Sequence, residues 1–411
     1  MRIVYAAGPG DVIGTYRHWA AGRDDPSQVA VTYSSQFYDF CRESGAIGYV
    51  ISTNKRKERI GDANLTIEHR PTFSQRGSAP MYHLGQIIWG LRLVISAIWF
   101  RADVVIVADW AHWFVLGFLP WFGIAVVPTL HCVLWPKQEP PISGLNRFIR
   151  KLNARFFRRR VKMALSLSGD ITAQVESMLR GGQLRIIPFL PTYRPTSFGE
   201  GFGPPASPPP FRVFFAGRIE RNKGVFDLLE IARRYKDACE EDDSDWGEPA
   251  LRRITEPMQM DIEFDLCGDG SQLEPLRKAI EVAGLGETFR LHGHSPRPLM
   301  MDLYEKCHVV IVPTTSDFVE GFNKVVAEGV LAGRPVITSS VCPALEYVRE
   351  AVVEVPPDQT SAYGDAILSL RNDPALYDVK RQASARVREQ FYDVNRGWKA
   401  AVSQAVHALM P

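Results

Sequence analysis

The chain has 411 residues, of which 45% are hydrophobic and 23% are charged, and this length suits two or three domains with separate cores. Its 48 Lys and Arg against 46 Asp and Glu give a net charge of +2, which argues against a dedicated nucleic-acid-binding protein. The balance hides an asymmetry, because residues 1–200 carry 24 basic and 14 acidic side chains whereas residues 201–411 carry 24 and 32.

The first half of the chain alternates short apolar runs with helix-length segments. The runs expected to be strands are residues 2–7, 29–34, 47–52, 103–109, 124–131 and 163–168. Near-continuous apolar strands spaced in this way are typical of a parallel sheet covered on both faces. The first run is too short for a secretory signal. The six cysteines include no CxxC pair, so we expect a reduced, cytoplasmic protein.

Two segments of the first half bear on membrane contact. Residues 86–100 are strongly apolar but short and interrupted by Arg92, so no transmembrane helix is expected. Residues 147–162 carry eight cations and no acid, with apolar side chains at helical spacing, which predicts a basic amphipathic helix. Such a helix could bind an anionic membrane surface, as a peripheral protein does. It could equally pack its apolar side on the first sheet.

A second series of strands begins after residue 210. It comprises residues 212–217, 261–268, 289–294, 309–315, 335–340 and 351–356. The eight prolines within residues 188–210 predict a stiff linker between the two series.

The sequence therefore predicts an α/β protein with two doubly wound domains. The expected divisions are an N-terminal domain over 1–195, a linker over 196–210 and a C-terminal domain over 211–389. A last helix at about 390–411 is expected to pack back on the first domain. The acidic stretch 237–248 reads as a solvated insertion, and its D-x-D match at Asp243 to Asp245 is discounted as a metal motif because no strand leads into it.

The first candidate site follows the strand at 212–217. There, Gly217-Arg218 and Lys223-Gly224 form a turn that leads into a helix beginning at Val225. A strand, a glycine turn and a helix N-terminus leave main-chain amides that can bind phosphate. The two cations could then clamp a diphosphate. A glycine turn with solvated cations is the alternative on this motif alone.

The second candidate site follows the strand at 309–315. Glu320 is expected in the loop beyond it, and a helix starting near Gly321 would place Glu328 two turns later on the same side. Two carboxylates there could bind the hydroxyl groups of a sugar and a ribose. Taken alone, the pattern favours a helix-capping carboxylate and a solvated glutamate.

Together these motifs resemble the retaining glycosyltransferases of the GT-B fold, the family 4 type. That family has a GR…KG turn, then E-G-F-G about a hundred residues later and a second glutamate eight residues after the first. The matching residues are Gly217, Arg218, Lys223, Gly224, Glu320, Gly321, Phe322 and Glu328. The resemblance covers residues 212–356, and the first half only in layout. It implies two Rossmann-like domains facing a central cleft.

The resemblance assigns roles in the C-terminal domain. Arg218 and Lys223 would bind the diphosphate of a nucleotide diphosphate sugar and stabilise the charge that develops as the sugar leaves. Glu320 would hold the hydroxyls of the transferred sugar, and Glu328 would bind the ribose. Main-chain amides of Phe322, Asn323 and Lys324 would lie beside the sugar. The backbone near His294 and Ser295 would meet the base. Asn323 departs from the glycine usual at its position.

In the N-terminal domain the resemblance places His131 near the sugar and the attacking acceptor. The glycine turn of Gly8, Gly10 and Gly14 would approach the phosphates and the acceptor. The implied acceptor is a polysaccharide, a glycolipid or a lipid-linked saccharide, and neither a metal nor a cofactor is expected. The alternatives are a nucleotide-sugar-binding protein without transfer activity, or another GT-B enzyme such as an epimerase or a phosphorylase.

Overall fold

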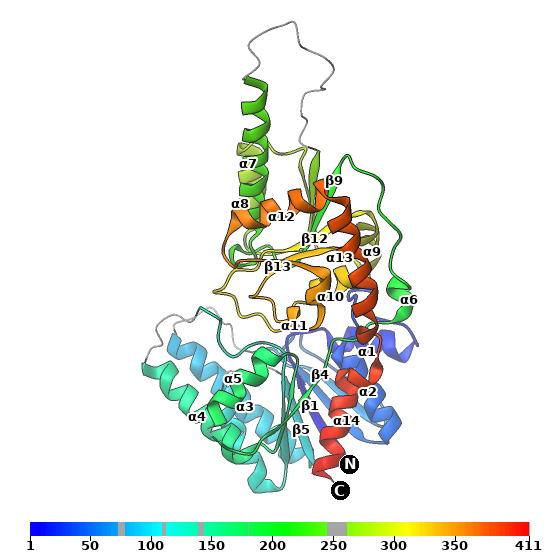
Figure 1. Ribbon diagram of the computed structural model, residues 1–411. Helices are drawn as coiled ribbons and strands as arrows, with labels where there is room; N and C mark the ends of the chain where they lie inside the picture. Colours follow the sequence, from blue (N-terminus) through cyan, green and yellow to red (C-terminus); the bar gives the residue numbers. More distant parts are fainter. Residues whose placement is uncertain (73–78, 109–111, 139–143, 180, 245–260, 411) are drawn as a thin grey trace, which may run out of the picture. The chain divides into compact units, whose positions relative to one another are not determined.

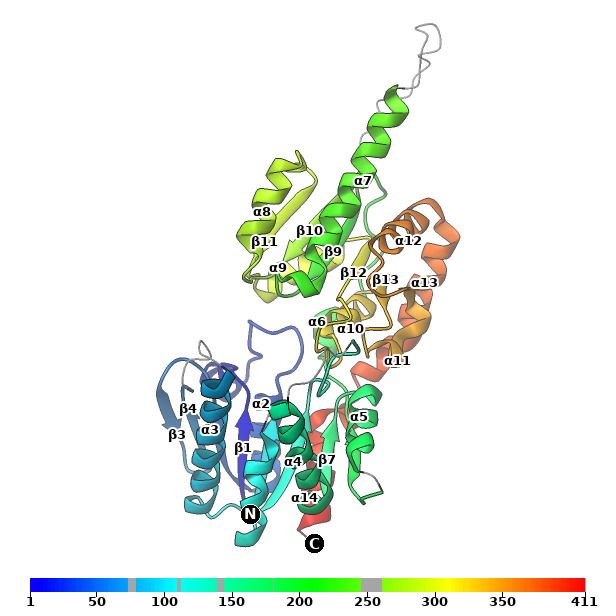
Figure 2. The same ribbon diagram turned by 90° about the vertical axis from the view of Figure 1, so that its left-hand side faces the viewer.

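The computed structural model describes residues 1–72, 79–108, 112–138, 144–179, 181–244 and 261–410. The chain folds into two compact units, each built on a parallel sheet (Figure 1, Figure 2). Unit 1 comprises Met1–Trp135, Glu139–Tyr193 and Phe391–Pro411, and unit 2 comprises Pro136–Gln138 and Arg194–Gln390. The expected α/β class with two doubly wound domains is confirmed.

Unit 1 contains an eight-stranded sheet in the order β3-β4-β2-β1-β5-β6-β7-β8. The strands are β1 (Arg2–Ala7), β2 (Ile47–Ser52), β3 (Glu58–Gly61), β4 (Leu65–His69), β5 (Val104–Ala108), β6 (Ala125–Leu130), β7 (Met163–Ser166) and β8 (Arg185–Pro188). All neighbours pair in parallel except β3 with β4. The chain moves outward from β1 in both directions, so the strand order reverses between β1 and β5.

Helices cover both faces of this sheet, as its buried apolar strands require. They are α1 (Val12–Ala20), α2 (Tyr33–Ser44), α3 (Ala79–Trp99), the 3₁₀ helix η1 (Trp113–Phe122), α4 (Gly144–Arg160), α5 (Gly169–Leu179), the 3₁₀ turn η6 (Val394–Arg396) and α14 (Trp398–Leu409). Figure 1 shows α3, α4 and α5 on one face and α1, α2 and α14 on the other. The C-terminal helix α14 thus belongs to unit 1.

The strand expected at residues 29–34 was wrong. Residues 33 and 34 begin α2, and the Thr32 hydroxyl caps this helix by accepting the main-chain N–H of Ser35 at 3.1 Å. A threonine cap of this kind offers the backbone a local bond that favours a helix start over a strand. Three strands were missed: β3, β4 and β8 lie toward the sheet edges, and their short, partly polar sequences lack a continuous apolar run.

The apolar segment near residue 90 is longer than expected. It forms the 21-residue helix α3, and Pro80–Trp99 is long and apolar enough to cross a membrane by length and composition. Trp89, Leu93 and Ala97 of this helix are nonetheless buried in the core of unit 1. The helix therefore packs against the core of unit 1, and its apolar composition is explained in part by this contact.

Unit 2 contains a six-stranded parallel sheet in the order β11-β10-β9-β12-β13-β14. The strands are β9 (Phe211–Ala216), β10 (Ile262–Cys267), β11 (Phe289–Gly293), β12 (Val309–Val312), β13 (Val336–Ser339) and β14 (Val352–Val355). All six match runs expected from the sequence. The order reverses between β9 and β12, as in dinucleotide-binding folds.

The helices of unit 2 also cover both faces of its sheet (Figure 1). They are α6 (Pro195–Phe198), α7 (Val225–Ser244), α8 (Leu273–Val282), α9 (Arg297–Lys306), α10 (Lys324–Leu331), α11 (Leu345–Val348), α12 (Thr360–Asn372) and α13 (Pro374–Val387), with 3₁₀ turns η2 (Arg221–Lys223), η4 (Arg349–Ala351) and η5 (Arg388–Phe391). A core cluster forms where α7, α8 and α12 meet the strands. The later part of the expected acidic insertion, including Asp245, lies outside the described residues.

Residues 196–210, expected to be a linker, belong to unit 2 and are fastened to it. The buried guanidinium of Arg334 donates to the carbonyl of Gly203 at 2.8 Å, and Nε2 of His308 lies 2.9 Å from the carbonyl of Ala206. Phe198 is buried and contacts Tyr304 edge to face. The prolines keep the segment out of the sheet, while these polar contacts fix its path.

Candidate functional site

The candidate site of unit 2 lies where its strand order reverses. The chain leaves the carboxyl ends of β9 and β12 toward opposite sides of the sheet, which opens a crevice there in folds of this kind. The turn 217–224 follows β9, and the loop 313–323 follows β12. Both motifs singled out from the sequence therefore meet at the position that the topology favours for a ligand.

Glycines let the turns at this edge approach one another closely. Gly268 follows β10 with a φ of +146°, and a Cβ atom there would lie 1.7 Å from the carbonyl oxygen of Gly217. Gly224 has a φ of +72°, and its Cβ atom would lie 2.1 Å from the carbonyl oxygen of Pro313. No side chain fits such contacts, so both positions require glycine. The main chains after β9, β10 and β12 are thus packed together.

Two hydrogen bonds that Ser271 donates to Glu220 join the first two turns. The Glu220 carboxylate accepts the main-chain N–H of Ser271 at 2.9 Å and the Ser271 hydroxyl at 2.7 Å. These hydrogen bonds favour the ionised form and lower the pKa of Glu220. The turn that carries Arg218 and Lys223 is therefore fixed by the adjacent turn after β10, which contains Ser271.

Replacing Gly268 by alanine is expected to destabilise unit 2 by about 1–3 kcal/mol, the cost of forcing a side chain into a sparsely populated backbone region, and to displace the Gly217 turn. Gly286→Ala is the matched control, because a Cβ atom at Gly286 meets nothing within 4 Å. Urea unfolding followed by far-UV circular dichroism measures the difference. Equal midpoints for the two variants would contradict the steric role of Gly268.

Lys223 and Glu320 form the centre of the site. The Lys223 ammonium lies 2.6 Å from Oε2 of Glu320, and both side chains are only 12% exposed. Asn323 donates from its side-chain amide to the same oxygen at 3.0 Å, and the N–H of Gly321 donates to Oε1 at 3.2 Å. We call these three side chains, Lys223, Glu320 and Asn323, the Lys–Glu–Asn cluster. Its contacts fix the position of the Glu320 carboxylate.

An aromatic ring supports the two cations. The Phe318 ring lies 3.8 Å from the Lys223 ammonium and 5.5 Å from the Arg218 guanidinium, distances at which ring and cation attract. Arg218 is exposed, and no other described residue accepts a hydrogen bond from it. The sequence analysis missed Phe318, because a single aromatic residue in a loop follows no pattern. An anionic ligand at this edge would meet one solvated cation and one paired cation.

Asn323 has a left-handed backbone with a φ of +67°. Asparagine adopts this region more readily than other side chains do, which explains how it replaces the glycine usual in related motifs. Helix α10 begins at Lys324, so the expected start near Gly321 was wrong by about one turn. Glu320 lies in the loop before the helix, and helical periodicity does not relate it to Glu328.

Glu328 is buried, with 6% exposure, and its Oε2 accepts the phenolic hydroxyl of Tyr304 at 2.8 Å. This excludes the solvated glutamate that the motif taken alone favoured, and the role of Glu328 with a ribose stays a prediction. Burial lowers the pKa of Lys324 in the first turn of the same helix, although the carboxylate of Glu328 opposes this shift. The buried Glu328 carboxylate thus partly stabilises the charged form of Lys324 in the first turn of α10.

His294 and Ser295 follow β11 on the same side of the sheet. His294 is exposed. The Ser295 hydroxyl lies 3.1 Å from the carbonyl of Gly293 and 3.2 Å from Sγ of Cys267, so it is tied to the ends of β10 and β11. Gly293 in turn accepts the main-chain N–H of Gly268 at 2.8 Å. The predicted base-binding segment is thus continuous with the glycine turns.

In unit 1, His131 directly follows β6. Its Nε2 lies 3.2 Å from the hydroxyl oxygen of Thr129, which also accepts the indole N–H of Trp398 at 2.8 Å. The imidazole lies tilted against the Tyr33 ring at 4.4 Å between centroids and edge to face with the Phe189 ring at 5.4 Å. The ring is half-buried and its orientation depends on the C-terminal helix, a dependence that no local sequence pattern could reveal.

The glycine turn of unit 1 connects β1 to α1 at the reversal of strand order. The Ser52 hydroxyl reaches the carbonyls of Gly8 at 3.0 Å and Gly10 at 2.6 Å. Side chains at Gly8 or Gly10 would meet no atom within 4 Å, whereas one at Gly14 would lie 2.7 Å from Asp11. The close contact with Asp11 explains the glycine at position 14, whereas the space beside Gly8 and Gly10 is open.

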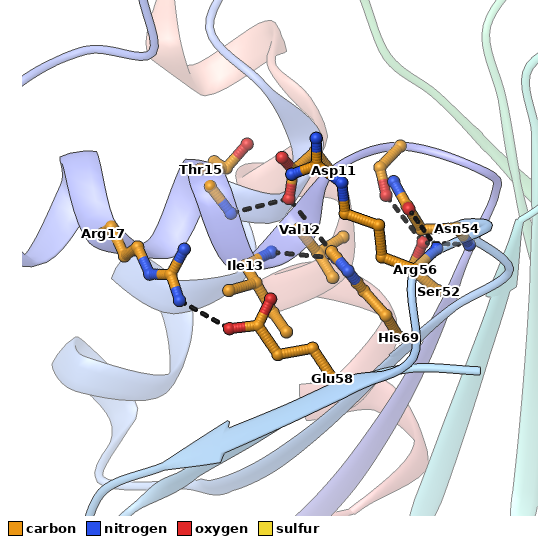
Figure 3. A network of polar contacts seen from close by, with 12 residues as sticks. Asp11, Val12, Ile13, Thr15, Arg17, Ser52, Asn54, Arg56, Glu58 and His69 are labelled. Carbon is orange, nitrogen blue, oxygen red and sulfur yellow. Dashed lines mark hydrogen bonds and ion pairs between the residues drawn. The ribbon is translucent and has the colours of Figure 1, made fainter. Parts of the chain in front are cut away.

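His69, which the sequence analysis did not single out, supports the start of α1 (Figure 3). Its Nε2 accepts the N–H of Ile13 at 3.2 Å and lies 3.4 Å from the carboxylate of Asp11. Burial lowers the pKa of His69, so the neutral imidazole serves as an acceptor. Over the part of the chain that the structure describes, no group of three or more His, Cys, Asp or Glu side chains could hold a metal ion.

Unit 2 is similar in sequence to a known protein family. Residues 202–389, almost the whole of unit 2, match the family model "Glycosyl transferases group 1". A 2-deoxystreptamine N-acetyl-D-glucosaminyltransferase from Streptomyces fradiae is 27% identical over 267 residues, which are 62% of this chain and 56% of that protein. The match thus spans about half the length of that curated relative.

Solved structures with similar folds cover the full chain. Anabaena HepE in complex with UDP aligns with a TM-score of 0.65 at 15% identity, over 100% of this chain and 99% of that one. The chain has the GT-B fold. An Escherichia coli GT-B structure bound with UDP-2-fluoro glucose aligns with a TM-score of 0.70 at 12% identity, over 100% and 99% of the two chains. At such low identity these GT-B structures establish the architecture alone.

Proposed function

We propose that the protein is a glycosyltransferase that moves a sugar from a nucleotide diphosphate sugar to a saccharide or lipid-linked acceptor. The observation that supports this most is the Lys–Glu–Asn cluster at the reversal of strand order, within the segment that matches group 1 glycosyltransferases. The curated relative above is named as a glycosyltransferase, and both structural relatives are described with UDP or a UDP-sugar.

In this proposal Arg218 and Lys223 bind the donor diphosphate and stabilise the negative charge that grows on it. The Glu320 carboxylate, fixed by Lys223 and Asn323, accepts hydrogen bonds from hydroxyls of the transferred sugar. Glu320 acts as a positioning group, and its ion pair with Lys223 fixes the carboxylate in place. The exposed segment at His294 and Ser295 would meet the base, and Glu328 the ribose.

The acceptor would be bound by unit 1, with His131 near its attacking hydroxyl and the open space at Gly8 and Gly10 available to a ligand. We propose that transfer retains the anomeric configuration, as in the family 4 type, with the leaving phosphate accepting the proton of the acceptor. On this route no metal is needed, because the cations and main-chain amides neutralise the diphosphate. The proposed setting is cytoplasmic.

A panel of UDP-, GDP- and ADP-sugars tests the proposal. A donor at a hundred times its Kd should stabilise the protein by about 2.7 kcal/mol, visible as a raised thermal midpoint, and should be hydrolysed slowly without an acceptor. Proton NMR of the released or transferred sugar would show the anomer. If no nucleotide sugar shifts the midpoint or is consumed, the proposed activity is wrong.

A further inference from the structure

Helix α3 has a second apolar side that faces away from the core. Its inner side buries Trp89, Leu93, Val94 and Ala97. Its outer side exposes apolar residues three, four or seven positions apart, so they share one side of the helix. They are Met81, Leu84, Leu91, Ile95 and Trp99, of which Trp99 is 86% exposed. A soluble helix would normally place polar side chains there.

The 3₁₀ helix η1 extends this apolar surface. It has no charged residue, and it exposes Phe118, Trp121 and Phe122. The two helices touch, because a Cβ atom at Gly90 of α3 would lie 2.9 Å from the Val115 side chain of η1. Single exposed apolar residues are ordinary, whereas exposed aromatic and aliphatic side chains gathered on two helices that pack against each other are typical of an interaction site.

Helix α4 adds positive charge beside this patch. A Cβ atom at Gly117 of η1 would lie 3.7 Å from the Phe156 ring, and the Arg160 guanidinium lies 5.4 Å from the Trp121 ring. The exposed cations of α4 recur at intervals of one to four residues: Arg147, Lys151, Arg155, Arg158, Arg159 and Arg160. Leu145 and Phe148 of the same helix are exposed.

We define residues 79–99, 113–122 and 144–160 as the α3–η1–α4 face. Figure 1 shows α3 and α4 on the same side of the unit 1 sheet. None of the three segments contains an aspartate or a glutamate. Exposed tryptophans next to arginines, without any acid, match the chemistry of a bilayer interface, where indole rings sit at the headgroups and cations meet lipid phosphates.

We propose that the α3–η1–α4 face binds an anionic phospholipid bilayer. The outer side of α3 and the aromatic residues of η1 enter the interface, and α4 contacts the headgroups. Because the inner side of α3 is part of the unit 1 core, this helix lies along the surface and does not cross it. The sequence alone left the basic helix undecided between lipid and sheet. The structure buries Phe156 and Phe157 and leaves Phe148 and six of the helix's seven cations exposed.

A second copy of this chain is a weaker candidate for this face. A two-fold dimer would place the same patch against itself, and the cations of α4 would then face cations. Such like-charge contacts disfavour association. An anionic bilayer instead complements both the apolar and the charged parts of the face.

Vesicle sedimentation with the full chain tests the proposal. We expect binding to phosphatidylglycerol-containing vesicles, weaker binding at high salt, and little binding to pure phosphatidylcholine. The triple variant Trp99→Ser, Trp121→Ser, Phe122→Ser should weaken binding to the anionic vesicles at least tenfold. Lys151→Gln, Arg155→Gln, Arg159→Gln should weaken it and remove most of the salt dependence.

Two sets of control variants lie in unit 2. Val282→Ser with Val379→Ser removes exposed apolar side chains, and Arg277→Gln, Lys278→Gln, Lys306→Gln removes exposed cations. Both sets should bind vesicles as the unchanged chain does. If the test and control variants lose vesicle binding equally, the proposal is wrong. It is also wrong if the unchanged chain binds no vesicles but forms a concentration-dependent dimer that the Trp99, Trp121 and Phe122 triple variant abolishes.

Thermal unfolding verifies that each variant is folded. Membrane binding is independent of the proposed sugar transfer, because the face contains none of the donor-site residues. A chain that binds vesicles but no nucleotide sugar would overturn only the proposed activity.

Discussion

Lys223→Ala is expected to reduce sugar transfer by about 10²–10³-fold, the loss typical of removing one group that stabilises developing negative charge. The same change removes the ammonium that lies 2.6 Å from the Glu320 carboxylate. Among the residues that the structure describes, Glu320 would then keep the Asn323 amide and the Gly321 N–H as donors. The variant should lose both charge stabilisation at the diphosphate and the fixed orientation of the carboxylate.

Glu320→Ala should cause a loss of similar size, and the double variant should lose little more than either single variant. Residues that act as one unit show such non-additive effects. Initial rates of nucleoside diphosphate release, measured with the donor that stabilises the protein, provide the comparison.

Arg221→Ala is the matched control for Lys223. It removes a cation from the same 3₁₀ turn, but the Arg221 guanidinium lies 4.3 Å from the Phe226 ring and has no part in the Lys–Glu–Asn cluster. Its rate should stay within a few-fold of that of the unchanged chain. Near-normal transfer by the Lys223 or the Glu320 variant would refute the assigned site.

Arg334→Met is expected to destabilise unit 2 by about 3 kcal/mol or more, because each hydrogen bond to a charged group contributes roughly 1.5–3 kcal/mol. The Arg334 side chain is fully buried and donates to three carbonyls, those of Tyr304 at 2.9 Å, Gly203 at 2.8 Å and Glu305 at 2.7 Å. Two of these carbonyls end helix α9, where a cation is also favoured by the helix dipole. Methionine fills space but leaves all three without this donor.

Hydrogen exchange is the measurement of choice, because it reports each unit separately. Amides near the end of α9 and around Gly203 should exchange faster in the variant, and those of unit 1 should not change. Arg349→Met is the control, since Arg349 is exposed and its surface ion pair with Glu354 contributes little. Unchanged exchange around Gly203 would show that Arg334 does not fasten this segment.

The sequence predicted the strands of unit 2 well because each is a short apolar run followed by a glycine, a proline or a polar turn. The same rule failed at residues 29–34, where the cap at Thr32 gives the backbone a helical start. It also missed β3 and β8, which tolerate polar side chains because they are the edge strands of the unit 1 sheet, and β4, which lies next to β3. Apolar runs identify buried strands, and they say little about edges.

Periodicity misled the interpretation of Glu320 and Glu328. The spacing of eight residues suggested one helical face, but the positive φ of Asn323 delays the helix and leaves Glu320 in the loop. Glu328 then turns toward Tyr304 and is buried. Whether a glutamate is solvated depends on a partner elsewhere in the chain, here 24 residues away in α9.

By itself the sequence determined the α/β class and the positions of the glycine turn and of Glu320, because apolar runs, glycines and charged motifs act locally. Only the tertiary structure paired Lys223 with Glu320 across 97 residues and placed Trp398 beside Thr129 across 269. It also decided that one side of α3 is core and the other is surface, since an apolar composition does not specify which side a neighbour covers.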